Sequence, residues 1–142
     1  MKIEISRLND AYHFEAENEQ GRKIHMDASP DIGGSNLGFR PMQLLLASLG
    51  GCSSIDIVNI LKKQKQDIKD IKVTVEGERE KGAIPSLFTE IHVHFQLFGD
   101  LDEEKVRKAV DLSVNKYCSV IKTLEKTAKI TNSFEVVSAV PH

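Results

Sequence analysis

The sequence predicts an α+β fold in a single domain that spans residues 1–142. Apolar residues alternate with polar ones in two separate parts of the chain, which is the two-residue period of antiparallel strands. Between these parts lies one long apolar stretch that opens with a proline, which favours a helix. The expected order is an N-terminal antiparallel sheet, a long central helix, a second hairpin, further helices and a final strand.

Three short strands are predicted near the start of the chain, where apolar residues alternate between groups of turn-forming residues. The alternating residues are Ile3, Ile5, Tyr12, Phe14, Ala16, Ile24 and Met26. Residues 9–10 and 18–21 supply the turns, so we expect an antiparallel meander. Residues 29–40 then concentrate glycine, proline, serine and asparagine in one long connection, and loops of that length are often functional.

The central helix is predicted over residues 41–65. Pro41 suits the first turn, where its missing N–H is not needed, and lysines at the other end suit the negative end of the helix dipole. Apolar side chains fall on nearly every side of the helix, so one sheet face cannot bury them all. They are Leu44, Leu45, Leu46, Leu49, Ile55, Ile57, Val58, Ile60 and Leu61. Polar residues interrupt the stretch too often for a membrane span, so we expect a buried helix and no membrane contact.

The second half of the chain predicts a hairpin, helices and a last strand. Alternating apolar residues over 71–75 and 91–97 flank a turn at residues 82–86. Acidic residues at 102–104 suit the start of a helix that continues to Tyr117. A further helix is expected over residues 118–127 and a strand over about residues 130–137.

Charge and composition exclude some partners. The chain carries 19 basic and 21 acidic residues and a net charge of −2, so it lacks a strong field to hold a nucleic acid. Charged residues near the N-terminus stand where a signal peptide needs an apolar segment, so we expect a cytoplasmic protein. In a reducing cytoplasm, a permanent structural disulfide is not expected.

Two cysteines are the main candidates for chemistry. Cys52 follows Gly50 and Gly51 inside the predicted helix, where each glycine costs about 1 kcal/mol relative to alanine. A close approach of another backbone, or room for a small ligand beside the sulfur, would explain the pair. The alternative is that Cys52 is a small buried apolar residue.

Cys118 stands at the start of a predicted helix, close to Lys116. A helix N-terminus and a nearby cation favour the thiolate and would lower the pKa of Cys118, but position alone makes an inert thiol the better expectation. A redox pair with Cys52 requires Cα atoms closer than about 7 Å, which the sequence does not establish.

Other motifs favour plain structural roles. His92 and His94 have a spacing that could hold zinc, but no third ligand lies near them in the sequence, so we interpret them as part of a solvated strand face. The glycines at residues 33–38 lack the spacing of a phosphate-binding or dinucleotide-binding loop. No metal and no bound cofactor are expected.

Residues 38–52, which end in Leu-Gly-Gly-Cys, resemble the central helix of the OsmC/Ohr family of osmotically inducible and organic hydroperoxide resistance proteins. Residues 85–95 resemble the second hairpin of that family, and residues 116–120 resemble its second-cysteine segment. The separation of the two cysteines also agrees. Within the family, the chain is most similar to the OsmC-like branch that carries the Leu-Gly-Gly-Cys form.

The resemblance implies an OsmC-like fold and an intertwined homodimer whose two central helices pack together, with active sites between the subunits. It also implies that Cys52 attacks the O–O bond of an organic hydroperoxide and that Cys118 resolves the resulting sulfenic acid. That chemistry is sound, because a thiolate is the nucleophile and a second thiol converts sulfenic acid to a disulfide. An external thiol or dithiol would then reduce the disulfide.

One departure from the family keeps alternatives open. The family glutamate ten residues before the cysteine is Met42 here, and its neighbour Gln43 is neutral. The family arginine has no clear match among Arg7, Arg22 and Arg40. The alternatives to a peroxidase are therefore an OsmC-like dimer that binds a small apolar ligand or partner in the same cleft, and another cysteine enzyme or a metal protein.

Overall fold

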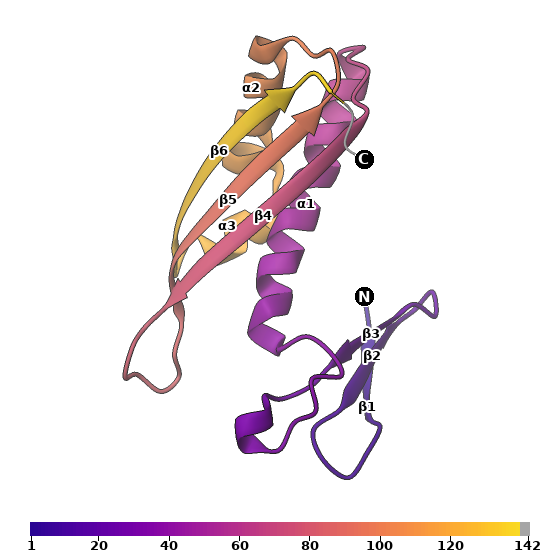
Figure 1. Cartoon of the computed structure of the whole chain (residues 1–142), viewed down its shortest axis with the longest axis vertical. Coiled ribbons are helices and arrows are strands. Elements are labelled where there is room, and N and C mark those ends of the chain that lie inside the picture. Colours follow the sequence, from indigo (N-terminus) through magenta and orange to yellow (C-terminus); the bar gives the residue numbers. More distant parts are fainter. Residues whose placement is uncertain (140–142) are drawn as a thin grey trace. The chain divides into compact units, whose positions relative to one another are not determined.

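The computed structural model describes residues 1–139 and confirms the α+β class (Figure 1). Its backbone forms two compact units, one over Met1–Leu45 and one from residue 46 on. Each unit is built around its own three-stranded sheet. The prediction of a single domain stays a prediction.

The first unit contains the predicted meander. Strands β1 (Ile3–Arg7), β2 (Phe14–Asn18) and β3 (Lys23–Met26) pair antiparallel in that order. The alternation predicts that the second strand begins at Tyr12, but β2 begins two residues later, at Phe14. The reason is a closed turn, in which Asn9 Oδ1 accepts the backbone N–H groups of Ala11 and His13.

The long connection after β3 is held by one carboxylate. Asp27, which is buried, accepts backbone N–H groups from Ala28, Ser35 and Leu37 at 2.7, 3.1 and 3.1 Å. A short 3₁₀ helix, Pro30–Ile32, lies inside this loop. The loop is thus ordered by hydrogen bonds to a side chain, and its end returns to β3 through backbone bonds between Phe39 and residues 25 and 27.

The second unit packs helices on one face of its sheet (Figure 1). The sheet contains β4 (Asp70–Arg79), β5 (Phe88–Phe98) and β6 (Lys129–Val137), with β4 and β5 antiparallel and β6 parallel to β5. The helices are α1 (Pro41–Lys63, whose first residues belong to the first unit), α2 (Glu103–Leu112) and α3 (Ser119–Leu124). The π-helical turn η2 (Ser113–Tyr117) joins α2 to the segment before α3.

The sequence predictions for these elements are confirmed within a few residues. Helix α1 starts at Pro41 as expected and ends two residues before the predicted end at residue 65. Asp102 caps α2 by accepting the N–H groups of Glu104 and Lys105. This is the expected effect of an acidic residue at a helix start.

The core of the second unit lies between α1, the sheet and the later helices. From Ile91 to Leu97, every second residue of β5 is buried in it, as the alternation predicts. The largest of its fully buried side chains are Phe95, Leu49, Ile57, Leu61, Ile91, Leu97, Ile121, Val93, Val106 and Val110. These side chains come from α1, β5, α2 and α3, so the four elements share one apolar core.

The two glycines before Cys52 have different surroundings. A Cβ atom on Gly50 would lie 3.0 Å from Val75 Cγ2 and 3.5 Å from Val73 Cγ1, so the glycine lets α1 rest directly against β4. The expected close approach is therefore made by valine side chains of a strand. A Cβ atom on Gly51 would have no neighbour within 4 Å, because this residue lies on the outer side of α1.

Helix α1 is less buried than expected within one chain. Only 28% of its most apolar 18-residue window is buried, and Ile55 is 72% exposed. By length and composition alone, α1 also meets the criteria for a membrane-spanning helix, which core helices of soluble proteins meet as well. Within the described part of the second unit, the side of α1 that carries Ile55 is therefore exposed.

Replacing Gly50 by leucine should lower the free energy of unfolding by about 1–3 kcal/mol, because the larger side chain must push α1 away from β4. Gly50→Ala should stay within about 1 kcal/mol of the wild type, since the Val75 methyl group can shift slightly and alanine favours the helix. Chemical denaturation followed by circular dichroism measures both changes. A Gly50→Leu variant as stable as the wild type would contradict the close contact.

Candidate active site

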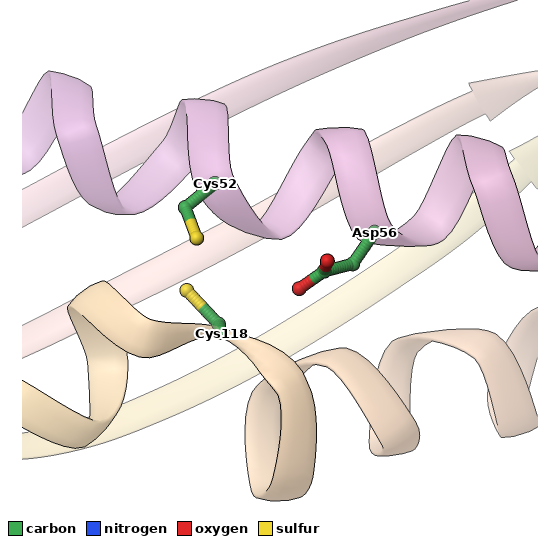
Figure 2. Close-up of side chains that lie close together, drawn as sticks. All are labelled: Cys52, Asp56 and Cys118. Atoms are coloured by element: carbon green, nitrogen blue, oxygen red, sulfur yellow. The ribbon is translucent and has the colours of Figure 1, made fainter.

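The two cysteines, far apart in the sequence, lie side by side in the structure (Figure 2). Cys52 lies on α1, and Cys118 lies between η2 and α3. The two Sγ atoms and one carboxylate oxygen of Asp56 are all within 4.8 Å of one another. Both cysteines are free thiols, so a short movement separates the reduced pair from a disulfide.

The turn before α3 determines where the Cys118 sulfur lies. The Cys118 N–H donates to the Ser113 carbonyl oxygen at 2.8 Å, which closes the π-helical turn. Cys118 then leaves the helical conformation and becomes the N-cap of α3, where its Sγ accepts the Ile121 N–H at 3.4 Å. The predicted position of Cys118 at a helix start is thus confirmed.

Ser53 connects the Cys118 sulfur to α1. Its hydroxyl oxygen lies 3.4 Å from Cys118 Sγ and 2.9 Å from the Leu49 carbonyl oxygen. A serine hydroxyl has one proton, so it can donate to only one of these acceptors at a time. Ser53 is fully buried, and it can therefore support the sulfur in either protonation state without help from water.

Burial raises the pKa of Cys118, which is 0% exposed. The hydrogen bonds from Ser53 and from the Ile121 N–H act in the opposite direction, while Cys52 adds to the rise in pKa. This direction agrees with the inert thiol that position alone favours, and the lowering that a helix start would give does not occur. Removing the sulfur from water outweighs the helix N-terminus, and the Lys116 ammonium group lies over the Tyr117 ring at 5.3 Å.

Asp56 is a site residue that the sequence analysis missed. Its Oδ2 accepts a hydrogen bond from the buried Ser113 hydroxyl at 3.2 Å, and Ser113 Oγ also lies 3.1 Å from the Ser53 carbonyl oxygen. The signal was available, because residues four apart on a helix share one face. Asp56 stands four residues after Cys52, and the carboxylate points toward the sulfur pair (Figure 2).

A cavity of about 500 Å³ opens next to this cluster. Asp56 lines it together with Asn59, Ile60, Lys63, Gln64, Leu112 and Tyr117. The Gln64 Oε1 atom is buried and has no hydrogen-bond partner among the described residues. The cavity therefore combines apolar walls with a few polar groups, as small-molecule sites do.

His92 and His94 lie outside the cluster. His92 bonds to Thr131 Oγ1 and Ser133 Oγ at 2.7 and 2.9 Å, and His94 bonds to the same serine oxygen at 2.7 Å. They face the hydroxyl groups of β6 on the side of the sheet away from the core. The metal-ligand cluster found among residues 1–139 does not include either imidazole.

Gln43, Arg40 and Arg7 make hydrogen bonds within the turns and the helix start near them. Gln43 Oε1 accepts the Arg40 N–H at 2.9 Å, which caps the start of α1. The Arg40 side chain donates to the Gly38 carbonyl and to Asn36, and Arg7 donates to carbonyls in its own turn. The charged group beside the sulfur pair is instead an acid, Asp56.

The geometry can be compared with known proteins. A family model described as OsmC-like protein matches residues 33–133. Protein YhfA of Escherichia coli (strain K12) is 45% identical over 127 residues, which cover 89% of this chain and 91% of that protein. A hypothetical protein from Aquifex aeolicus VF5 superimposes with a TM-score of 0.84 at 32% identity, over 98% of this chain and 97% of that chain.

A more distant structure shares the fold. The organic hydroperoxide resistance protein OhrB of Bacillus subtilis superimposes with a TM-score of 0.67 at 18% identity, over 95% of this chain and 98% of that one. The family model covers most of the chain, including both cysteines and the elements that hold them. On these grounds the chain belongs to the family of OsmC-like proteins.

Proposed function

We propose that this protein reduces organic hydroperoxides, with Cys52 as the attacking thiolate and Cys118 as the resolving thiol. The observation that supports the proposal best is the approach of the two sulfur atoms and Asp56 to within 4.8 Å of one another. Membership of the OsmC-like family supports a redox or peroxide-related role. OhrB, an organic hydroperoxide resistance protein by name, has the same fold.

The different burial of the two sulfurs supports this division of roles. Cys52 is half-buried and can meet a substrate, whereas Cys118 is fully buried. The raised pKa keeps Cys118 protonated at neutral pH, and a thiol is a poor nucleophile. Cys52 therefore reacts first, and Cys118 acts after its neighbour has been oxidised.

The proposed reaction balances in two steps. The Cys52 thiolate attacks the terminal peroxide oxygen, the O–O bond breaks, and the alkoxide takes a proton and leaves as the alcohol. The Cys118 sulfur then attacks the sulfur of the Cys52 sulfenic acid, and the hydroxyl group leaves as water with the Cys118 proton. An external thiol or dithiol reduces the disulfide, so the cycle requires a reducing compartment such as the cytoplasm.

Ser53 and the Ile121 N–H fit the second step. As Cys118 loses its proton, negative charge develops on a sulfur that already lies 3.4 Å from each donor. Hydrogen bonds to a charged acceptor are stronger than bonds to a neutral one. These two donors therefore stabilise Cys118 when it attacks, although burial disfavours its ionisation beforehand.

One observation favours a second function. Asp56 belongs to the sulfur cluster and also lines the cavity beside it, which has apolar walls and a few polar groups. Slow peroxide chemistry would leave the cavity beside Asp56 as the functional feature. The protein would then bind a small apolar ligand or partner there without reducing it.

We also propose that two chains form a homodimer through the outer side of α1. Ile55 is 72% exposed there, and Gly51 leaves open space beside the helix. A small residue on an otherwise apolar helix face allows a second helix to approach closely. Packing two such faces together removes apolar surface from water, which favours association.

The proposed reaction predicts that one equivalent of cumene hydroperoxide removes both free thiols from the reduced protein. Cys52→Ser should keep the Cys118 thiol, and Cys118→Ser should stop at a Cys52 sulfenic acid that dimedone traps. Thiol counting and mass spectrometry measure these products, with Ser54→Ala as a control, because the hydroxyl of Ser54 bonds to the Gly50 carbonyl and not to either sulfur. If both thiols persist after long incubation, the result would instead support the second function, in which the protein binds a small apolar ligand or partner without reducing it.

Cys118 in the Cys52→Ser variant should ionise above the ordinary thiol value of 9.0, because desolvation dominates its pKa. Ser53→Ala in that background should raise the pKa further, since a donor to the sulfur is lost. The ultraviolet absorbance of the thiolate, followed against pH, measures both values. Ionisation at or below the ordinary pKa would contradict the buried position.

The same shift has a consequence for stability. The unfolded chain ionises at the ordinary pKa, whereas the folded chain holds the Cys118 proton to higher pH. The contribution of Cys118 to the unfolding free energy is thus full below the ordinary thiol pKa. It should fall as pH rises from there to the raised folded-state value, and in the Cys52→Ser background a Cys118→Ala substitution should remove this part of the pH dependence.

The proposed dimer predicts that Gly51→Leu separates the chains while each stays folded. The new side chain has open space in its own chain but would fill the gap needed by a second helix. Sedimentation velocity measures the mass, and circular dichroism confirms the helices. Lys105→Leu, an exposed change on α2, should leave the dimer intact, and a Gly51→Leu dimer or a monomeric wild type would refute the arrangement.

A further inference from the structure

Three groups that ligate zinc in proteins converge at one point of the second unit. They are Cys52 Sγ, Cys118 Sγ and one carboxylate oxygen of Asp56, all within 4.8 Å of one another. A tetrahedral zinc ion with Zn–S bonds of about 2.3 Å places its sulfur ligands about 3.8 Å apart. The distance between the two Sγ atoms exceeds this S···S distance by about 1 Å or less. Small side-chain rotations therefore suffice to enclose the ion.

Charge favours a divalent cation at this point. The ion pairs found among residues 1–139 do not include Asp56, whose hydrogen bond comes from the neutral Ser113 hydroxyl. Thiolate and carboxylate groups bind a metal ion through negatively charged atoms, and a divalent cation compensates that charge. A Zn²⁺ ion supplies that compensation, and binding releases the two thiol protons to solvent.

The surrounding hydrogen bonds hold two of the three ligands, Asp56 and Cys118, in place. The Ser113 hydroxyl contacts one carboxylate oxygen of Asp56, and the Ser53 hydroxyl and the Ile121 N–H contact Cys118 Sγ. Outer partners of this kind orient metal ligands and fix their geometry. Ser53 and Ser113 are 0% exposed, so water does not displace these supports.

We propose that the reduced protein binds one Zn²⁺ per chain through Cys52, Asp56 and Cys118, with a water molecule as the fourth ligand. Three protein ligands and one open position are typical of exchangeable or catalytic zinc sites, whereas closed structural sites use four protein ligands. The half-buried Cys52 leaves a route for the ion and the water. The bound ion occupies both sulfurs and therefore blocks their oxidation for as long as it stays.

The test is a Zn²⁺ titration of the fully reduced chain without oxygen or peroxide, in competition with a chromogenic chelator. Wild type should retain one equivalent, and Cys52→Ser and Cys118→Ser should each lose it. Asp56→Asn should bind at least about 10-fold more weakly, since it loses a charged ligand. The double variant His92→Ala/His94→Ala is the matched control and should bind like wild type, because these imidazoles are potential ligands outside the cluster.

A second measurement needs no variant at the cluster. One equivalent of Zn²⁺ should slow the alkylation of both thiols in the wild type, and a strong chelator should restore the original rate. The proposal is overturned if reduced wild type retains no stoichiometric zinc, if Asp56→Asn binds as tightly as wild type, or if zinc leaves alkylation unchanged. None of these readouts uses a hydroperoxide, so failure of the zinc site and failure of the peroxidase are separate results.

Discussion

The site depends on one buried polar contact between α1 and the turn that precedes α3. The Ser113 hydroxyl lies within hydrogen-bonding distance of the Ser53 carbonyl and the Asp56 carboxylate, and the Ser53 hydroxyl reaches the Cys118 sulfur. Buried polar groups without partners are costly, so these bonds favour one register between the two segments. The apolar core around them supplies most of the contact area, but it does not by itself place one sulfur opposite the other.

This contact also explains why the two cysteines differ. Cys52 is presented from a rigid helix at the edge of the core, whereas Cys118 is enclosed by its own turn and by α1. The half-buried sulfur is open to reagents, and the enclosed sulfur is reached mainly through its partner. Asp56 adds an acid to this pair, so two sulfurs and a carboxylate lie within 4.8 Å of one another.

Much of the fold followed from local pattern, because alternation and helical spacing are properties of neighbouring residues. The start of α1 at Pro41 and the inward residues of β5 are examples. The parallel pairing of β6 with β5 was not predictable in this way, since it joins residues about forty positions apart. The meeting of Cys52 with Cys118 came only from a family resemblance, for the same reason.

The site residues that the sequence analysis missed show a second limit. Asp56 could have been found from its spacing to Cys52, whereas the helical spacing of Ser113 with Val106 and Ala109 places it on the inward face without indicating its partners. The helix end beside Cys118 is a local feature, and by itself it would lower the pKa of the thiol. Desolvation depends on what the rest of the chain places around the sulfur, and it outweighs the effect of the helix end.

The π-helical turn at Ser113–Tyr117 holds one more residue than an α-helical turn would. Ser113 contacts α1 through its side chain and closes this turn through its carbonyl oxygen, which accepts the Cys118 N–H at 2.8 Å. Each residue of an α-helix rotates the next by about 100°, so deletion of one residue here would turn the sulfur away from α1. Homologues that keep a cysteine at this point but have a shorter turn would therefore carry an isolated thiol. The number of residues in this segment thus becomes a criterion for recognising homologues whose two cysteines meet.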